Sequence, residues 1–252
     1  MQQILLIIPC YNEESRIDLN HFHNFQKNLP SQAISRNYQI YYLFANDGSK
    51  DQTANKISNF IQQNQLSGTW AIFNNPTNTG KANVISNAYQ WQKQNLNLSF
   101  DWVGYWDADL ATPLYEIFNM LSYRDLFYPE KKAIFASRVL KLGSRIIRKP
   151  LRHYLGRVFA TAVYLALRVG SYDSQCGAKL FSKDIADLAL SENFISPWIF
   201  DVEIMLRIKE QHITEYPLKE WEDIPGSKIK IFKEAFRVLN HLYKIRQAYL
   251  KN

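Results

Sequence analysis

The stretch Ile4-Leu-Leu-Ile-Ile8, which ends at Pro9, is a continuous apolar run typical of a strand buried on both faces of a sheet. Similar runs recur along the first half of the chain, at Tyr38 to Ala45, Thr69 to Phe73 and Asp101 to Trp106. Segments of helical length separate them, at Ser15 to Leu29, Asp51 to Gln63 and Lys81 to Gln94. Strands that alternate with helices predict an α/β fold, in which a mostly parallel sheet carries helices on both faces.

Polar residues follow each of these predicted strands. The four clusters are Tyr11-Asn12-Glu13, Asp47, Asn78 to Lys81, and Asp107 with Asp109. In parallel α/β sheets the ligand crevice lies at the carboxyl ends of the strands. Clusters at four strand ends therefore predict a single binding site at that edge of the sheet.

Asp107-Ala-Asp109 places two carboxylates in an i, i+2 relation at the end of a strand. Such a pair can bind one hard cation, which prefers oxygen ligands. Mg²⁺ or Mn²⁺ on Asp107 and Asp109 would bridge the phosphates of a nucleotide and stabilise the charge on a leaving group. The alternative is an ordinary surface turn, because Asp-x-Asp is a common pattern, but the position at the predicted site favours a metal.

The other clusters are suited to a nucleotide. Asp47 can accept a hydrogen bond from a uracil or guanine ring N–H, Glu13 can contact ribose hydroxyls, and Tyr11 can pack against the base. Two structural alternatives stay open, an Asx turn at Asp47 and capping of the next helix by Asn12.

Thr79-Gly80-Lys81 is not a phosphate-binding glycine loop. The P-loop pattern requires a glycine where this chain has Asn75, and no two glycines are two residues apart, as the dinucleotide fingerprint requires. We therefore expect side chains, including Lys81, and a metal to hold the nucleotide.

The formal net charge of +7 matches an excess of cations between residues 141 and 168. This stretch has no acidic residue, and its basic residues are Lys141, Arg145, Arg148, Lys149, Arg152, Arg157 and Arg168. Apolar residues, among them Ile147, Tyr154 and Val158, alternate with the cations. The combination predicts peripheral membrane contact, since apolar side chains enter the acyl boundary and cations meet the headgroups. Ordinary amphipathic helices packed on the sheet are the alternative.

Residues 1–228 are expected to form a single domain, followed at 229–252 by a basic amphipathic helix packed on the domain or at the membrane. Its apolar face is predicted to contain Phe232, Phe236, Leu239 and Leu242. The first residues do not form a signal peptide, and no apolar run approaches the roughly 20 residues of a membrane span. We therefore expect a cytoplasmic protein, peripheral at the cytoplasmic face of the membrane. Cys10 and Cys176 fit a reducing compartment and are expected in the core.

The polar clusters, in this order, resemble the family 2 glycosyltransferases. The matching segments are Ile8-Pro-Cys-Tyr-Asn-Glu-Glu14, Asn46-Asp-Gly-Ser-Lys-Asp-Gln-Thr53, Asn78-Thr-Gly-Lys-Ala82 and Asp107-Ala-Asp109. Two further segments resemble the polyprenyl-phosphate sugar transferases, especially the dolichyl-phosphate glucosyltransferases: Asp173-Ser-Gln-Cys-Gly-Ala-Lys-Leu-Phe181 and Trp221-Glu-Asp-Ile-Pro-Gly-Ser-Lys228. The resemblance implies an A-type glycosyltransferase fold with a Rossmann-like sheet.

The resemblance also implies an inverting, metal-dependent hexosyltransferase with a polyprenyl-phosphate acceptor. UDP-glucose is the first expectation for the donor and GDP-mannose the next. The donor is implied to lie against Pro9, Tyr11, Glu13, Asp47 and Asp107, with Asp109 on the metal. Arg138 and Lys228 are implied as contacts to phosphate groups.

Asp173 and Asp201 are the candidate carboxylates on the acceptor side. A lipid phosphate is already ionised near neutral pH and needs no general base, whereas a sugar hydroxyl does. For a phosphate acceptor we expect these two carboxylates, with Arg138, to position groups more than to remove protons.

Three other functions are compatible with parts of the sequence. A soluble glycosyltransferase of the same fold would act on a glycan or polysaccharide hydroxyl. A nucleic-acid-binding protein would account for the basic stretch but not for the acidic edge, which repels phosphate, so no nucleic-acid partner is expected. A non-catalytic module would bind a nucleotide sugar without transferring it.

Overall fold

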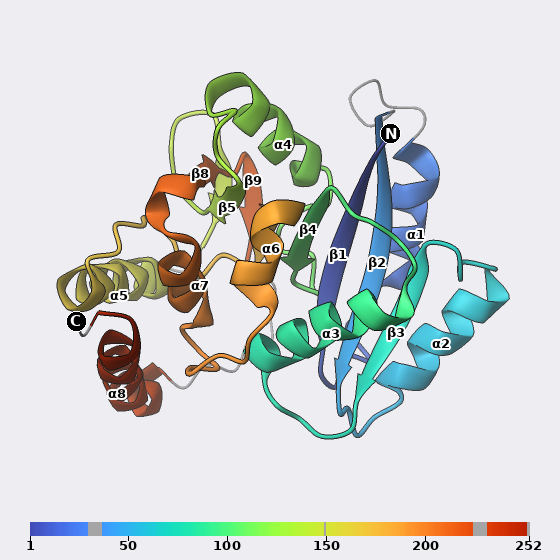
Figure 1. Cartoon of the computed structure of the whole chain (residues 1–252), viewed down its shortest axis with the longest axis horizontal. Coiled ribbons are helices and arrows are strands. Elements are labelled where there is room, and N and C mark those ends of the chain that lie inside the picture. Colours follow the sequence, from blue (N-terminus) through green and yellow to red (C-terminus); the bar gives the residue numbers. More distant parts are fainter. Residues whose placement is uncertain (30–36, 149, 224–230, 251–252) are drawn as a thin grey trace.

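The computed structural model describes residues 1–29, 37–148, 150–223 and 231–250, with the side chains of 150–153 and 231–236 outside this description. The main sheet has seven strands in the order β3-β2-β1-β4-β7-β5-β8 (Figure 1). Their bounds are β1 Gln2–Cys10, β2 Tyr38–Asp47, β3 Trp70–Asn75, β4 Trp102–Trp106, β5 Ala133–Ser137, β7 Ala178–Ser182 and β8 Ile213–Pro217. A two-stranded sheet pairs β6 (Arg145–Ile147) with β9 (Glu220–Glu222).

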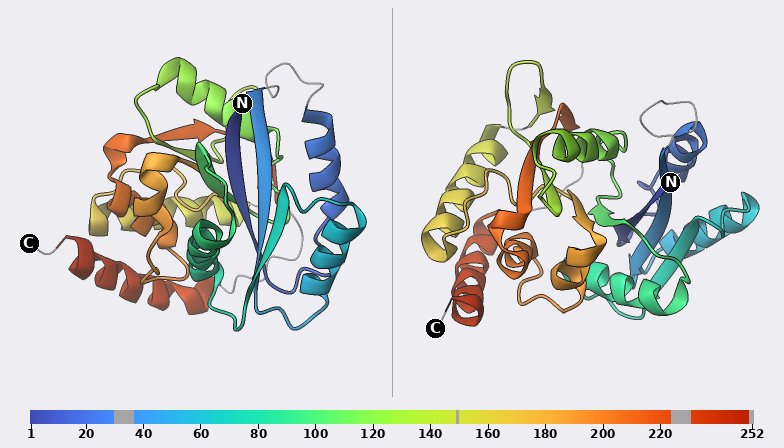
Figure 2. Two further views of the ribbon diagram at one scale, coloured as in Figure 1. Left: turned by 45° about the vertical axis from the view of Figure 1, so that its right-hand side comes forward. Right: turned by 45° about the horizontal axis from the view of Figure 1, so that its top comes forward.

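Helices cover both faces of the main sheet. Figure 2 shows α3 on one side of β1 to β3 and α1 and α2 on the other. The helices are α1 Leu19–Asn28, α2 Thr53–Gln63, α3 Lys81–Asn95, α4 Glu116–Phe127, α5 Pro150–Leu167, α6 Lys183–Leu190, α7 Phe200–Ile208 and α8 Ile231–Tyr249, with a short 3₁₀ turn, η3, at Glu210–His212. Among the helices described, none has the length and apolar character that crossing a bilayer requires.

The central strand β1 contributes to two hydrophobic cores. Leu5 and Ile7 face one core with α3, α6 and α7, while Ile4, Leu6 and Ile8 face the other with α1, α2 and α4. All five side chains are fully buried. The unbroken apolar run is thus the consequence of a strand covered on both faces.

The predicted α/β fold is confirmed, and each predicted strand is present within about two residues of its expected bounds. The first helix was predicted to begin at Ser15 but begins at Leu19, because the Asp18 carboxylate accepts from the His21 N–H and caps it there.

The second half of the chain adds an arrangement that the sequence did not predict. Strand β7 lies between β4 and β5 and runs antiparallel to both, whereas β1 to β4 are mutually parallel. Residues 173–177, which precede β7, are thereby brought to the end of β4.

Helix α8 packs beside α5 (Figure 1). Arg246 Nη1 donates to the Ala166 carbonyl at 2.5 Å, and Tyr249 Oη donates to the buried Glu203 at 3.0 Å. Leu242 and Ile245 are buried, whereas Leu239, one turn before Leu242, is exposed. Phe232 and Phe236 lie outside the described side chains.

Candidate active site

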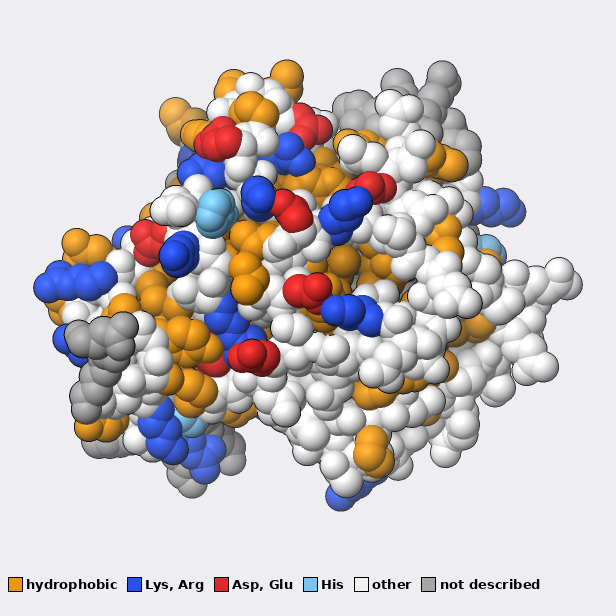
Figure 3. Space-filling model, in the orientation of Figure 1, with side chains coloured by type: hydrophobic (Ala, Val, Ile, Leu, Met, Phe, Trp, Pro, Cys, Tyr) orange, Lys and Arg blue, Asp and Glu red, His pale blue; other side chains and the backbone are white. Residues whose placement is uncertain are grey.

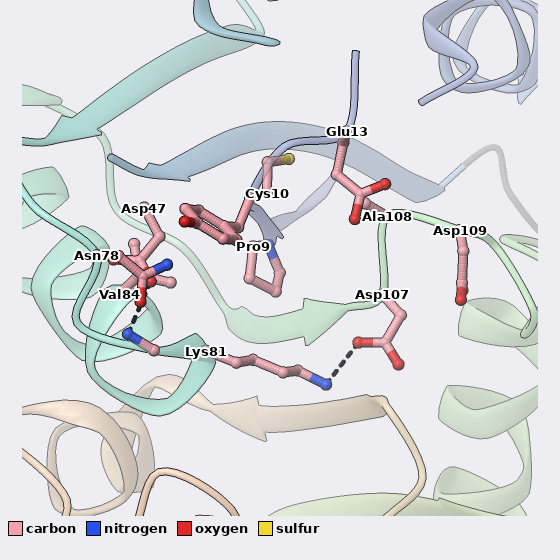
Figure 4. Close-up of a pocket in the computed structure, with 12 residues that line it drawn as sticks. Pro9, Cys10, Glu13, Asp47, Asn78, Lys81, Val84, Asp107, Ala108 and Asp109 are labelled. Carbon is pink, nitrogen blue, oxygen red and sulfur yellow. Dashed lines mark hydrogen bonds and ion pairs between the residues drawn. The ribbon is translucent and has the colours of Figure 1, made fainter. Parts of the chain in front are cut away.

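A pocket of about 390 Å³ opens at the carboxyl ends of β1, β2 and β4 and the amino end of α3. It contains residues from all four predicted polar clusters, together with small and apolar residues between them (Figure 4). Its lining consists of Pro9, Cys10, Tyr11, Glu13, Asp47, Asn78, Gly80, Lys81, Val84, Asp107, Ala108 and Asp109. The expectation of one site at this edge of the sheet therefore agrees with the geometry.

Asp107 and Asp109 follow β4 and face this pocket (Figure 4). Asp109 accepts from the Ala111 N–H at 3.1 Å, which fixes the turn, and its side chain stays exposed. Partial desolvation, together with the neighbouring Asp107 carboxylate, raises the pKa of Asp109. A cation shared by the two carboxylates would relieve this repulsion.

The carboxylate donor set suits a hard divalent ion. Among the described residues there is no cluster of three or more histidine, cysteine or acidic side chains that could enclose a metal. Mg²⁺ commonly binds through one or two carboxylates and completes its shell with water and substrate phosphates. Asp107 and Asp109 fit that mode of binding.

Lys81, the first residue of α3, extends across the pocket to Asp107, with 2.5 Å between Nζ and Oδ1 (Figure 4). Desolvation opposes the ammonium charge, but the carboxylates of Asp107 and Asp201 outweigh it and raise the pKa of Lys81. The lysine is therefore a cation at neutral pH.

Asp47 is buried at the end of β2 and organises the loop before α3. Its Oδ1 accepts from Thr79 N, Thr79 Oγ1 and Asn75 Nδ2, and its Oδ2 accepts from Gly80 N at 2.7 Å. Gly80 has a φ of +85°, which disfavours a side chain. Asp47 thus has a structural role, and Oδ2 retains acceptor capacity toward the pocket.

The loop after β1 presents Tyr11 and Glu13. Glu13 forms an ion pair with Arg16, which was not predicted although the i, i+3 spacing signals it. Burial raises the pKa of Glu13, Arg16 opposes that rise, and Asp109 adds to it. Asn12 does not cap α1: it accepts from Lys50 N and its own N–H donates to Ser49 Oγ, so it joins the β1 and β2 loops.

Arg138 and Asp173 form a buried bidentate pair outside the lining of this pocket. Arg138 Nε and Nη2 donate to the two carboxylate oxygens at 2.6 and 2.7 Å, and Arg138 N donates at 3.0 Å. Desolvation opposes ionisation, but Arg138 outweighs it and lowers the pKa of Asp173 to about 2. The guanidinium also lies 5.1 Å from the centre of the Trp221 ring.

Asp201 is likewise buried, in a network around Lys179. Lys179 Nζ donates to Asp201 Oδ1 at 2.6 Å and to the carbonyls of Ser174 and Cys176 at 2.9 and 2.6 Å. Tyr105 Oη also donates to Asp201 Oδ1. The network holds residues 173–177 against the end of β4.

Sequence reasoning missed Lys179 and Gly177. Lys179 is fully buried in β7. The available signal in the sequence was a lysine between the apolar residues Ala178 and Leu180. Gly177 has no local signal, because its role comes from its contact with Asp107. Of the candidate residues, Pro9, Tyr11, Glu13, Asp47, Lys81, Asp107 and Asp109 line one pocket, Arg138, Asp173 and Asp201 lie outside its lining, and Lys228 lies outside the described residues.

The chain belongs to glycosyl transferase family 2, whose model matches residues 5–186. It is similar to a dolichyl-phosphate beta-glucosyltransferase of Trichomonas vaginalis, with 30% identity over 237 residues, 90% of this chain and 68% of that protein. The dolichyl-phosphate beta-glucosyltransferase of Homo sapiens is 27% identical over 267 residues, 99% of this chain and 76% of that protein. The family resemblance expected from the sequence motifs is confirmed.

Solved structures have the same fold at low sequence identity. Glucosyl-3-phosphoglycerate synthase from Mycobacterium tuberculosis, in complex with Mn²⁺, UDP and glucosyl-3-phosphoglycerate, matches with a TM-score of 0.65 and 15% identity, covering 97% of this chain and 80% of that chain. Mannosyl-3-phosphoglycerate synthase from Rubrobacter xylanophilus matches with a TM-score of 0.67 and 13% identity, and the match covers 100% of this chain and 77% of that chain. The A-type glycosyltransferase fold is thus confirmed.

Proposed function

We propose that this family 2 glycosyltransferase moves glucose from UDP-glucose onto a polyprenyl phosphate, with inversion at the anomeric carbon. The observation that carries the proposal is the gathering of Glu13, Asp47, Lys81, Asp107 and Asp109 in one pocket at the carboxyl edge of the sheet. The similarity to the dolichyl-phosphate beta-glucosyltransferases supports this choice of donor sugar and acceptor.

The pocket is proposed to hold the nucleotide through side chains. Tyr11 is 40% exposed at the pocket, which leaves its ring accessible to a base. Asp47 Oδ2 accepts only one hydrogen bond among those described, so it can accept a second from a ring N–H. Lys81 supplies positive charge for the diphosphate.

Mg²⁺ or Mn²⁺ is proposed to bind Asp107 and Asp109. When bound, such an ion neutralises charge that develops on the departing nucleotide diphosphate. The Mn²⁺ in the complexes of the Mycobacterium tuberculosis synthase supports a divalent ion in a site of this fold.

The acceptor side is proposed to lie at Arg138. Burial and the neighbouring Arg138 lower the pKa of Arg148, so two guanidiniums are close together while Asp173 neutralises one of them. The guanidinium N–H donors of these two arginines suit a phosphate acceptor. Asp173, with its low pKa, is a poor proton acceptor, and Asp201 forms an ion pair with Lys179, so both carboxylates are proposed to position their partners.

Peripheral membrane contact is proposed through residues 141–168. Tyr154, Val158 and Leu165 are 69%, 67% and 63% exposed, and their spacing places them on one outer stripe of α5. Figure 3 shows hydrophobic and basic side chains together over α5 and α8. Each cation near an anionic leaflet would contribute about 1 kcal/mol.

The rest of the predicted interfacial segment divides between core and surface. Phe159 and Ile146 pack against the hydrophobic cores, as the alternative of ordinary amphipathic packing expects, whereas Leu142 is fully exposed. Location at the cytoplasmic face stays a prediction.

The test is transfer from UDP-[¹⁴C]glucose in the presence of polyprenyl phosphate and Mn²⁺ or Mg²⁺. We expect label in an organic-soluble, acid-labile product. Label found only in an aqueous glycan would instead support the soluble glycosyltransferase, and donor binding without any transfer would support a non-catalytic module.

A further inference from the structure

The Lys81 ammonium occupies the space beside the proposed metal ligand Asp107. Its Nζ lies 2.5 Å from Asp107 Oδ1 and 5.7 and 5.9 Å from the ring centres of Tyr105 and Phe200. Figure 4 shows the side chain extended toward this carboxylate. The ammonium is thus held by one carboxylate and two aromatic rings.

The position of this lysine is not explained by helix stability. Lys81 is in the first turn of α3, where a cation is disfavoured by about 0.3–1 kcal/mol because it faces the positive end of the helix dipole. Asp107 is the carboxylate that the ammonium contacts directly, whereas Asp201 acts on it from a distance and is itself bonded to Lys179 and Tyr105. Lys81 and Asp107 therefore form a local pair within the pocket.

The Asp107 carboxylate contacts Gly177 as well as the Lys81 ammonium. A Cβ on Gly177 would lie 1.8 Å from Asp107 Oδ2, 2.2 Å from Cγ and 2.6 Å from Oδ1, so the carboxylate packs directly against that glycine. A dication bound to Asp107 would consequently be close to the Lys81 ammonium, and the two cations would repel each other.

We propose that Lys81 makes metal binding dependent on the nucleotide diphosphate. Without a nucleotide, the Lys81 ammonium weakens the binding of a dication to Asp107 and Asp109. A bound diphosphate stabilises the ammonium and the dication at the same time. A diphosphate has enough negative charge to interact with the lysine and the metal at once. Coupling of this kind is reciprocal, so the metal increases nucleotide affinity by the same factor. The inference rests on the proposed donor and metal site and adds the residue that links them.

The test is Mn²⁺ binding, followed by the electron paramagnetic resonance signal of free Mn²⁺, with and without UDP. In the wild type, UDP is expected to raise Mn²⁺ affinity. In Lys81→Met, which keeps the aliphatic stem, Mn²⁺ affinity without UDP is expected to rise about tenfold and the effect of UDP to fall by a similar factor, within the roughly 5- to 150-fold range of coupled sites. Lys81→Arg keeps the charge and is expected to retain the coupling.

Lys132→Met is the matched control, because Lys132 forms an ion pair of the same 2.5 Å length with Asp184, and neither residue lines the pocket. It is expected to behave as the wild type. Unchanged or weaker Mn²⁺ binding by Lys81→Met without UDP would overturn the inference while leaving the proposed function intact. Failure of the wild type to bind Mn²⁺ even with UDP would overturn the proposed metal site and, with it, the coupling.

Discussion

Gly177 lies so close to Asp107 that a Cβ at position 177 would be 1.8 Å from Asp107 Oδ2. The two residues are far apart in the sequence and meet because β7 pairs antiparallel with β4, where the Asp107 N–H donates to the Gly177 carbonyl at 3.0 Å. The absence of a side chain at position 177 is therefore what allows this carboxylate its place in the pocket.

Gly177→Ala is expected to displace the Asp107 carboxylate and reduce transfer by roughly 100-fold, the scale of losing one electrostatic contact to a transition state. Glucose transfer and thermal unfolding are the measurements. Gly170→Ala is the control, because a Cβ there meets nothing within 4 Å. Full activity in Gly177→Ala would mean that the position of Asp107 is unimportant.

Asp109→Ala is expected to abolish transfer and metal-dependent UDP binding together, because one of two proposed protein ligands is lost. The protein should stay folded, since the Asp109 side chain is exposed. Calorimetric titration with UDP, with and without Mn²⁺, measures the effect, and Asp125→Ala on the surface of α4 is the control. Normal turnover in folded Asp109→Ala would remove the metal role.

Asp173 is expected to contribute to stability in a pH-dependent way. Its pKa is lowered from 3.8 to about 2 in the folded protein, so its contribution is present above pH 3.8 and is lost as the pH falls toward 2. At 1.36 kcal/mol for each pKa unit, this lowering of the pKa contributes about 2 kcal/mol to the free energy of unfolding at neutral pH.

Urea unfolding of the wild type and Asp173→Asn between pH 6 and pH 2 tests this expectation. The gap in unfolding free energy between the two proteins should narrow by about 2 kcal/mol as the pH falls. A gap that is constant over this range would show that the Arg138 pair does not shift the pKa of Asp173.

The outer stripe of α5 is expected to bind anionic vesicles. Val158→Asp with Leu165→Asp should weaken binding to phosphatidylserine vesicles several-fold, because both exposed side chains become charged, while UDP affinity and melting temperature change little. Leu126→Asp on α4 is the control, as Leu126 is 76% exposed outside this segment. Equal vesicle binding by all three proteins would make the stripe an ordinary surface.

The Lys179–Asp201 pair is expected to be structural. Lys179→Met should destabilise the fold by about 3–5 kcal/mol, because it leaves a carboxylate buried without its cation. Lys179→Met combined with Asp201→Asn should recover part of that loss, since the amide can still accept from Tyr105 Oη. Urea unfolding of the two single variants and the double variant measures the coupling, and additive losses would contradict it.

The hydrophobic pattern alone predicted β1 to β4, the helices between them and the edge where the polar residues lie. Those features depend on local properties: an apolar run of a strand's length, a turn, and the direction that parallel strands share. The predicted residues of the pocket lie at the end of one of these strands, just after it, or at the start of the next helix, so their meeting in one pocket could be anticipated. They are Pro9, Tyr11, Glu13, Asp47, Lys81, Asp107 and Asp109.

The tertiary structure alone decided which side chains neutralise one another. The pairing of Lys81 with Asp107, of Arg138 with Asp173 and of Lys179 with Asp201 depends on distances between segments that are remote in the sequence. The same holds for Gly177, whose role arises only after β7 enters the sheet antiparallel between β4 and β5. A sequence shows which residues can carry charge, but burial and proximity in the folded chain determine which charged side chains form ion pairs and which stay available to bind a ligand.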